Sequence, residues 1–151
     1  MSTADCSALQ FTDGGHSLTL DLDFSPDSST LITCGADNQF KIWLVPGMTE
    51  DDGQSHSNNV YQCRYSYDGW IYVGSDNGNV DLYNPNYDLS STYVTNPSGG
   101  RITSLSVHPS SREAVFSKST DYLFRSTVTN THIYQGLNMR VAFSENYFAN
   151  S

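Results

Sequence analysis

The sequence predicts an all-β fold built from a repeated unit. Residues 22–43 return in looser form at 63–83 and again at 105–125, at spacings of about 40 residues. No segment shows the apolar spacing of a helix over the roughly ten residues that a stable helix needs. Turn-forming Ser, Thr, Asn, Asp and Gly are abundant, and only 15% of the residues are charged. Together these features indicate many short strands joined by tight turns.

The first copy contains three expected strands. At 18–24, Leu or Phe alternates with Thr or Asp, which predicts a strand with one buried apolar face. The segment 25–29, Ser-Pro-Asp-Ser-Ser, predicts a turn. The run 31–34 is short and almost wholly apolar, as in a strand buried on both faces, and a third strand is expected at 40–43. Residues 44–59 are predicted to form an acidic loop where an outer strand would otherwise lie.

The second copy follows the same order, with strands expected at 60–65, 70–73 and 80–83 and an outer strand at 91–95. Asp76-Asn77-Gly78 predicts a hairpin turn, because such turns need residues that tolerate positive φ.

The third copy runs from Arg101 to Gln135, and residues 137–143 look like the start of a fourth. The expected units are therefore 12–59, 60–98 and 99–136, with 137–151 beginning another.

Charge is uneven along the chain, whose net charge is −9. Residues 1–88 hold 13 acidic and two basic residues, a balance of −11, whereas 89–151 hold three acidic and five basic residues, a balance of +2. An acidic surface repels phosphate backbones, so direct nucleic-acid binding is not expected and a basic protein partner is favoured. The alternative is that exposed acidic turns serve only solubility.

The cysteines and histidines do not predict a metal, another cofactor or a disulfide framework. Cys6, Cys34 and Cys63 are odd in number and lack a C-x-x-C pair, which favours a reducing nuclear or cytoplasmic location. The four histidines have no metal-ligand spacing. No run approaches the ~18 apolar residues of a membrane span, so no membrane association is expected.

The first copy resembles the WD40 repeat, a blade of a β-propeller. Gly15-His16 precedes the segment 24–27, Phe-Ser-Pro-Asp, as in that repeat. The resemblance implies a hydrogen-bonded tetrad formed by His16, Thr33, Asp37 and Trp43. It also implies a partial propeller of about three antiparallel four-stranded blades and the start of a fourth.

The other copies match this pattern less closely. In the second, His56, Asp76 and Tyr83 match, with Tyr72 at the Thr position, and the third keeps only Asp121.

Enzymatic activity is not expected. His16 and Asp37 would also make half of a catalytic triad, but no Ser or Cys lies in a recognisable nucleophile elbow. A propeller-type enzyme with a site in the central channel is a weaker alternative, because the sequence lacks clustered carboxylates or metal ligands.

The first 63 residues also contain Gly15-His16 and the short segments 32–37, 41–43, 50–53 and, at the start of the second copy, 61–63. In these segments the chain is similar to the N-terminal WD40 domain of a replisome adaptor family, the acidic nucleoplasmic DNA-binding protein and chromosome transmission fidelity factor. This resemblance implies nuclear partners in DNA replication. A general scaffold or a ubiquitin-ligase substrate receptor is the alternative.

The expected function is a non-catalytic protein-interaction module that binds peptides or domain surfaces at the loops on top of the blades. Charged and aromatic residues at strand ends are the candidates, since these types are enriched at binding hot spots. They are Lys41, Arg64, Tyr67, Trp70 and Arg101. For the two aromatic residues the alternative is packing within a blade, and for the three basic ones it is solvated surface.

Three blades and a fraction do not close a ring, because propellers typically have about four to eight. We therefore expect the missing blades to come from the rest of a longer chain or from self-association. Residues 7–11 are a candidate outer strand for the last blade.

Overall fold

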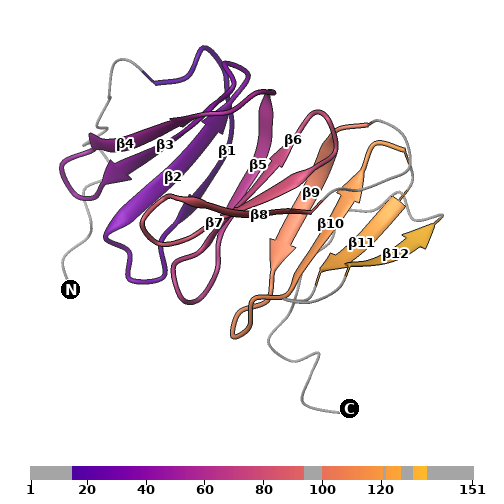
Figure 1. Cartoon of the computed structure of the whole chain (residues 1–151). Coiled ribbons are helices and arrows are strands. Elements are labelled where there is room, and N and C mark those ends of the chain that lie inside the picture. The colour runs from indigo at the N-terminus through magenta and orange to yellow at the C-terminus, as the bar shows by residue number, and fades with distance from the viewer. Residues whose placement is uncertain (1–14, 94–99, 121, 127–130, 136–151) are drawn as a thin grey trace, which may run out of the picture.

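The computed structural model describes residues 15–93, 100–120, 122–126 and 131–135. In these residues, twelve strands form three antiparallel sheets, and each sheet is a meander of four consecutive strands (Figure 1). Sheet 1 contains β1 (Thr19–Phe24), β2 (Thr30–Gly35), β3 (Gln39–Leu44) and β4 (Thr49–Ser55). Sheet 2 contains β5 (Val60–Tyr65), β6 (Ile71–Ser75), β7 (Val80–Tyr83) and β8 (Leu89–Tyr93). Sheet 3 contains β9 (Ile102–Val107), β10 (Ala114–Lys118), β11 (Tyr122–Ser126) and β12 (Thr131–Gln135).

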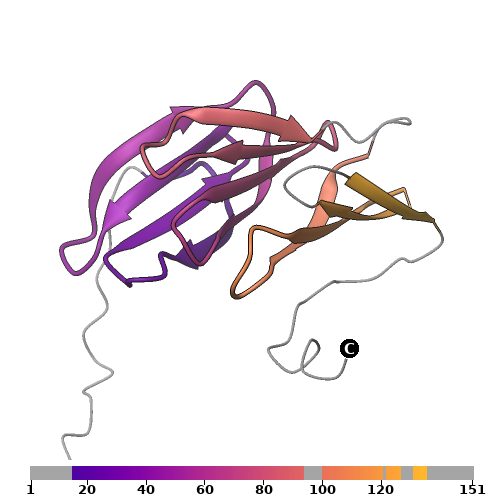
Figure 2. The same ribbon diagram turned by 60° about the horizontal axis from the view of Figure 1, so that its bottom comes forward.

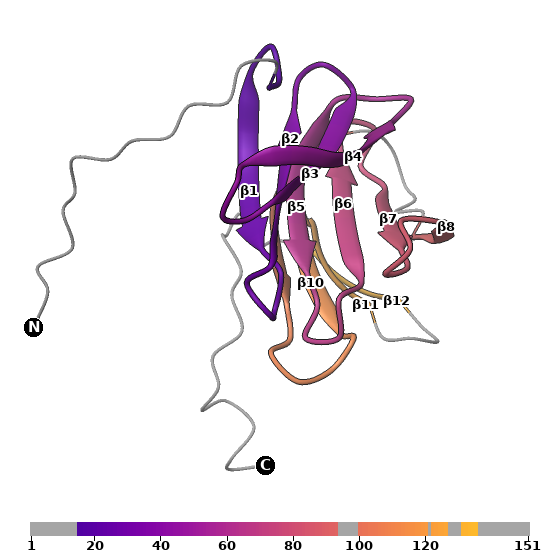
Figure 3. The ribbon, with the colours of Figure 1, turned by 90° about the vertical axis from the view of Figure 1, so that its left-hand side faces the viewer.

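The first strands of the three sheets lie side by side. Strand β5 contacts β1 and β2 on one side and β9 on the other. Sheet 2 lies between sheets 1 and 3 and packs against both (Figure 2). The view from the side of sheet 1 shows β1 and β5 running in the same direction (Figure 3). The described residues contain no helix, and the predicted all-β fold class is confirmed.

Two apolar cores hold the sheets together. Between sheets 1 and 2 lie Ile32, Cys34, Phe40, Ile42, Val60, Cys63, Ile71, Val73 and Tyr83. Between sheets 2 and 3 lie Tyr72, Val80, Leu82, Ile102, Leu105, Ala114, Phe116 and Phe124. Sheet 2 is thus covered on both faces, which explains why β6 and β7 are buried along their whole length. Gly74 is required there, because a Cβ atom would lie 2.8 Å from the Ile102 side chain.

The predicted turn at residues 76–78 forms between β6 and β7. Gly78 has φ of +83°, and a Cβ atom at this position would lie 2.5 Å from the carbonyl oxygen of Gly100. Any side chain here would therefore be both strained and obstructed.

The prediction for the apolar face of β1 was wrong. Leu22 and Phe24 are 53% and 55% exposed, whereas Asp21 and Asp23 are half-buried on the opposite face. The reason is the position of sheet 2, which packs against the aspartate side of β1. No sheet among the described strands covers the other side.

The acidic loop predicted at 44–59 was also wrong, since β4 pairs with β3 across seven residues of this segment. Glu50 and Asp51 are exposed and Asp52 is half-buried on this edge strand, where charges are tolerated and discourage association with other strands. The outer strand expected at 91–95 is β8, Leu89–Tyr93. The expectations for residues 7–11, Asp121 and 137–151 lie outside the described residues.

Candidate functional site

The four residues of the predicted tetrad lie together on sheet 1. His16 Nδ1 lies 2.8 Å from Asp37 Oδ1, and His16 Nε2 lies 2.9 Å from Thr33 Oγ1. The indole N–H of Trp43 donates to the same Thr33 oxygen at 2.8 Å. A consistent assignment has Nδ1–H donating to the carboxylate and the threonine hydroxyl donating to Nε2.

Each polar side chain of the tetrad therefore has a hydrogen-bond partner, which is the condition under which a buried polar network stabilises a fold. Burial opposes the ionisation of Asp37, but hydrogen bonds to its carboxylate, the one from His16 foremost, outweigh it and lower the pKa of the carboxyl group. Gly35 leaves room for the imidazole, because a Cβ atom there would lie 2.6 Å from the His16 side chain. The network joins the segment before β1 to β2, β3 and the turn between them.

Sheet 2 uses different partners from those predicted. His56 Nε2 lies 2.5 Å from Oδ2 of Asp81 on β7 rather than bonding to Asp76 in the turn. The hydroxyl of Thr92 on β8 donates to Asp81 Oδ1 at 2.5 Å. Tyr83 is not part of this hydrogen-bonded group but packs edge-on against Phe40 of sheet 1, with ring centroids 4.8 Å apart.

Tyr72, the other residue matched to the tetrad, donates its hydroxyl to the carbonyl oxygen of Arg112 at 2.7 Å. It therefore connects sheet 2 to the turn between β9 and β10. Sheet 2 therefore also contains a His–Asp pair, but its carboxylate comes from strand β7, whereas that of sheet 1 comes from the turn between β2 and β3.

A polar junction that the sequence did not reveal joins β1 to β5. Asp21 accepts the backbone N–H of Cys63 at 3.0 Å and a guanidinium N–H of Arg64. Asp23 accepts the backbone N–H of Tyr65 at 2.8 Å. These two amides belong to the edge of β5 that does not pair with β6. Alternating aspartates on β1 therefore satisfy alternating amides on β5, and they fix the two strands in parallel.

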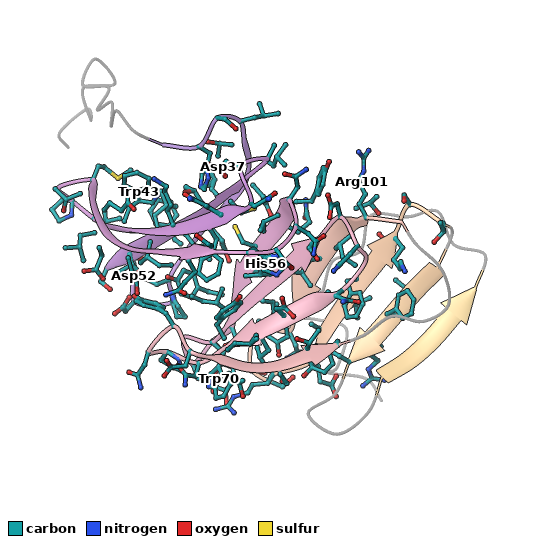
Figure 4. The ribbon with its side chains drawn as sticks, turned by 45° about the horizontal axis from the view of Figure 1, so that its top comes forward. Asp37, Trp43, Asp52, His56, Trp70 and Arg101 are labelled. Atoms are coloured by element: carbon teal, nitrogen blue, oxygen red, sulfur yellow. The ribbon has the colours of Figure 1, made fainter. Side chains whose placement is uncertain are left out.

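The structure does not bring the five predicted partner-binding residues onto one surface. Arg101 lies at the same end of the sheets as Asp37, whereas Trp70 lies at the opposite end (Figure 4). Arg101 lies over the ring of Tyr61, with 5.1 Å between the guanidinium carbon and the ring centroid. Tyr67 is 51% exposed in the turn between β5 and β6.

The other predicted residues have partners within the chain. Lys41 Nζ lies 3.1 Å from Glu50 Oε2, and it lies over the Trp43 ring on the open face of sheet 1. Arg64 is paired with Asp21 in the junction. The guanidinium group of Arg112 covers the Trp70 ring at 4.4 Å.

A groove that the sequence did not reveal lies at the Trp70 end of the sheets. It has a volume of about 320 Å³ and opens between the β1–β2 turn of sheet 1 and the β5–β6 and β7–β8 turns of sheet 2. We call it the turn groove. The residues that matter for its chemistry are Pro26, Asp27, Tyr65, Tyr67, Pro85 and Tyr87. The tyrosines come from two separate parts of sheet 2, and only the packing of sheets 1 and 2 brings them beside Asp27.

Neither a metal centre nor a membrane-spanning segment was found in the described part of the chain. No three or more His, Cys, Asp or Glu residues there are placed to hold a metal ion. No helix among these residues is long and apolar enough to cross a membrane.

Comparison with known proteins identifies the fold. A family model described as "WD domain, G-beta repeat" matches residues 7–43, a range that includes the whole tetrad. No curated protein matches the chain. Similar solved structures include the structure of U3-55K, with a TM-score of 0.74 and 14% identity over 82% of this chain and 41% of that chain. The crystal structure of the RRP9 WD40 repeats has a TM-score of 0.70 and 15% identity over 80% of this chain and 39% of that one.

The β-propeller domain of Cps50 (Swd1) from Myceliophteria thermophila has a TM-score of 0.67 and 14% identity over 78% of this chain and 37% of its own. This chain therefore spans about two fifths of the length of each of these structures. At such low identity the likeness establishes the fold, and the predicted WD40-type partial β-propeller is confirmed. Neither the family model nor these structures supports the resemblance to replisome adaptors.

Proposed function

We propose that the chain is a non-catalytic protein-interaction module whose scaffold is a partial WD40-type propeller. The observation that carries this proposal is the contrast between the interior and the surface. No buried side-chain nitrogen or oxygen in the described residues lacks a hydrogen-bond partner. Large apolar and aromatic side chains, by contrast, are exposed on sheet 1 and in the turns, including Leu22, Phe24 and Tyr67. Exposed groups of this kind favour binding to other proteins.

The two His–Asp pairs support a structural role over a catalytic one. Both ring nitrogens of His16 are within hydrogen-bonding distance of side chains in its own sheet. His56 likewise lies near Asp81 on one side and the backbone carbonyl of Asn58 on the other. A general base needs a ring nitrogen that can reach a nucleophile or a substrate, and both nitrogens of each histidine already have partners.

Part of the interaction is proposed to complete the propeller. In sheet 2, the face that carries Tyr65 and Tyr83 is covered by sheet 1. The corresponding face of sheet 1 carries Phe24 and Trp43, which share a row because both pair with Leu31. We propose that a further sheet packs on this face, supplied by the rest of a longer chain or by a second copy.

The partners are proposed to be proteins or peptides in the nucleus or cytoplasm, since the acidic character of residues 1–88 disfavours nucleic acid. The narrower role of a replisome adaptor rests on sequence resemblance alone. A general scaffold or a ubiquitin-ligase substrate receptor is the alternative.

Affinity purification with the immobilised chain tests the proposal. We expect discrete proteins that are displaced by an excess of the soluble chain and identified by mass spectrometry. Replication-fork proteins among them would support the adaptor role, and a ubiquitin-ligase subunit would support the receptor role. The proposal is overturned if no protein is displaced in this way, or if the chain turns over a substrate in a broad hydrolase and lyase screen.

A further inference from the structure

The turn groove combines an aromatic floor with an open rim. Tyr65 lies at the boundary between sheets 1 and 2, where its hydroxyl oxygen is 3.1 Å from Thr30 Oγ1. Burial raises the pKa of Tyr65 to about 12, so its ring remains neutral at physiological pH. Tyr87 is half-buried and packs against the core between the sheets, whereas Tyr67 is half-exposed. The rings of Tyr65 and Tyr87, which form the floor of the groove, are therefore held in place before any ligand binds.

Negative charge surrounds this floor. Hydrogen bonds from the Ser25 hydroxyl and from the backbone and hydroxyl of Ser29 lower the pKa of Asp27 to about 2, so this carboxylate is ionised at neutral pH. Burial raises the pKa of Tyr87, and the nearby charges of Asp51, Asp52 and Asp27 raise it further. Asp27 lines the groove, and Asp51 and Asp52 lie on β4 of the same sheet. Asp52 pairs with Ile42 and therefore lies on the face of sheet 1 that packs against sheet 2.

The charge of these three carboxylates is not neutralised within the described part of the chain, where Asp27, Asp51 and Asp52 form no ion pair. Asp68, on the other side of the groove, differs, because Arg112 Nε lies 2.6 Å from its Oδ2. The negative charge of the groove is thus concentrated on the side of sheet 1.

We propose that the turn groove binds a basic segment of a partner protein, with the stem of an arginine or lysine on the tyrosine floor and its charged end toward Asp27, Asp51 and Asp52. The inference rests on the proposed function and adds to it a surface and a class of partner. Tyrosine rings accept both the apolar stem and the cation of such side chains. Acidic or phosphorylated segments would be repelled by the same carboxylates. The surface lies at the opposite end of the sheets from Arg101, and Tyr67 is the one of the five predicted partner-binding residues that lines it.

Fluorescence anisotropy with labelled Gly-Ser peptides tests this directly. The peptides carry arginine, lysine, glutamate or proline at alternate positions and are titrated with the full chain. We expect the arginine and lysine peptides to bind and the glutamate peptide not to bind, with affinity falling as salt is raised. Tyr67→Ala should weaken binding about threefold, and the double change Asp27→Asn with Asp51→Asn by a similar factor.

Two matched variants serve as controls. Leu89→Ala truncates another exposed apolar side chain that does not line the groove, and Asp76→Asn removes a carboxylate at the opposite end of sheet 2. Neither should alter peptide affinity. Unchanged circular dichroism and melting temperature would confirm that each variant is folded.

The failure of this inference is distinguishable from the failure of the proposed function. If the wild-type chain and Tyr67→Ala capture the same partners equally well, the proposed binding site in the turn groove is wrong, but the proposed function as an interaction module is not affected. Preferential binding of the proline or glutamate peptide would contradict the proposal that the partner segment is basic. Equal loss of binding in the control variants would also count against the groove.

Discussion

The His56–Asp81 pair predicts a large effect from a single side chain. His56→Ala would leave the Asp81 carboxylate, whose side chain is 11% exposed, without the imidazole that lies 2.5 Å away. Removing one partner of a buried ion pair costs about 3 kcal/mol, because the remaining charge is poorly solvated. We expect a decrease of this size in the free energy of unfolding, measured with urea near pH 6. His108→Ala, in the turn between β9 and β10, is the control and should have a much smaller effect.

The same pair should make stability depend on pH. The hydrogen bond to Asp81 raises the pKa of His56 above its usual 6.5, so its contribution is fully present below pH 6.5 and is lost as pH rises through the higher folded value. Burial opposes the ionisation of Asp81, but hydrogen bonds from His56 and Thr92 lower its pKa below 3.8. Its contribution is therefore present above pH 3.8 and is lost as pH falls.

The difference in unfolding free energy between the native chain and His56→Gln should consequently be largest between pH 3.8 and 6.5. Urea titrations across this range measure it. A difference that stays constant up to pH 9 would contradict the assignment.

At the scale of strands, the sequence predicted most elements but not which faces they bury. The alternation of apolar and polar residues identified β1 correctly as a strand. The same alternation contains no information about the side on which a neighbouring sheet packs. The tetrad of sheet 1 was predictable because its members lie close in sequence within one repeat. In sheet 2, Asp76 and Asp81 were both available to His56, and only the fold shows which carboxylate it meets. The acidic β4 was missed because its pairing depends on the edge of β3 rather than on its own residues.

The junction between β1 and β5 predicts local changes in amide protection. Asp23→Ala removes the acceptor of the Tyr65 amide, and Asp21→Ala removes that of the Cys63 amide. Losing one such bond is worth about 1 kcal/mol, so each variant should speed exchange of its own amide by about fivefold. Hydrogen exchange followed by NMR measures both amides separately. Equal acceleration at Cys63 and Tyr65 in either variant would indicate global destabilisation instead.

At the scale of the whole molecule, the open face of sheet 1 predicts association. Leu22 and Phe24 are each more than half exposed on the face that corresponds to the covered face of sheet 2. Burying a large apolar side chain contributes about 2 kcal/mol to the free energy of association, so packing another sheet on this face is favourable. Light scattering after size-exclusion chromatography should show oligomers, or polydisperse material, whose mass grows with concentration. Leu22→Lys with Phe24→Lys should shift the chain toward monomer without loss of β-sheet circular dichroism, whereas Leu89→Lys on β8 should not. A wild-type chain that stays monomeric at every concentration would show that the open face of sheet 1 does not drive self-association.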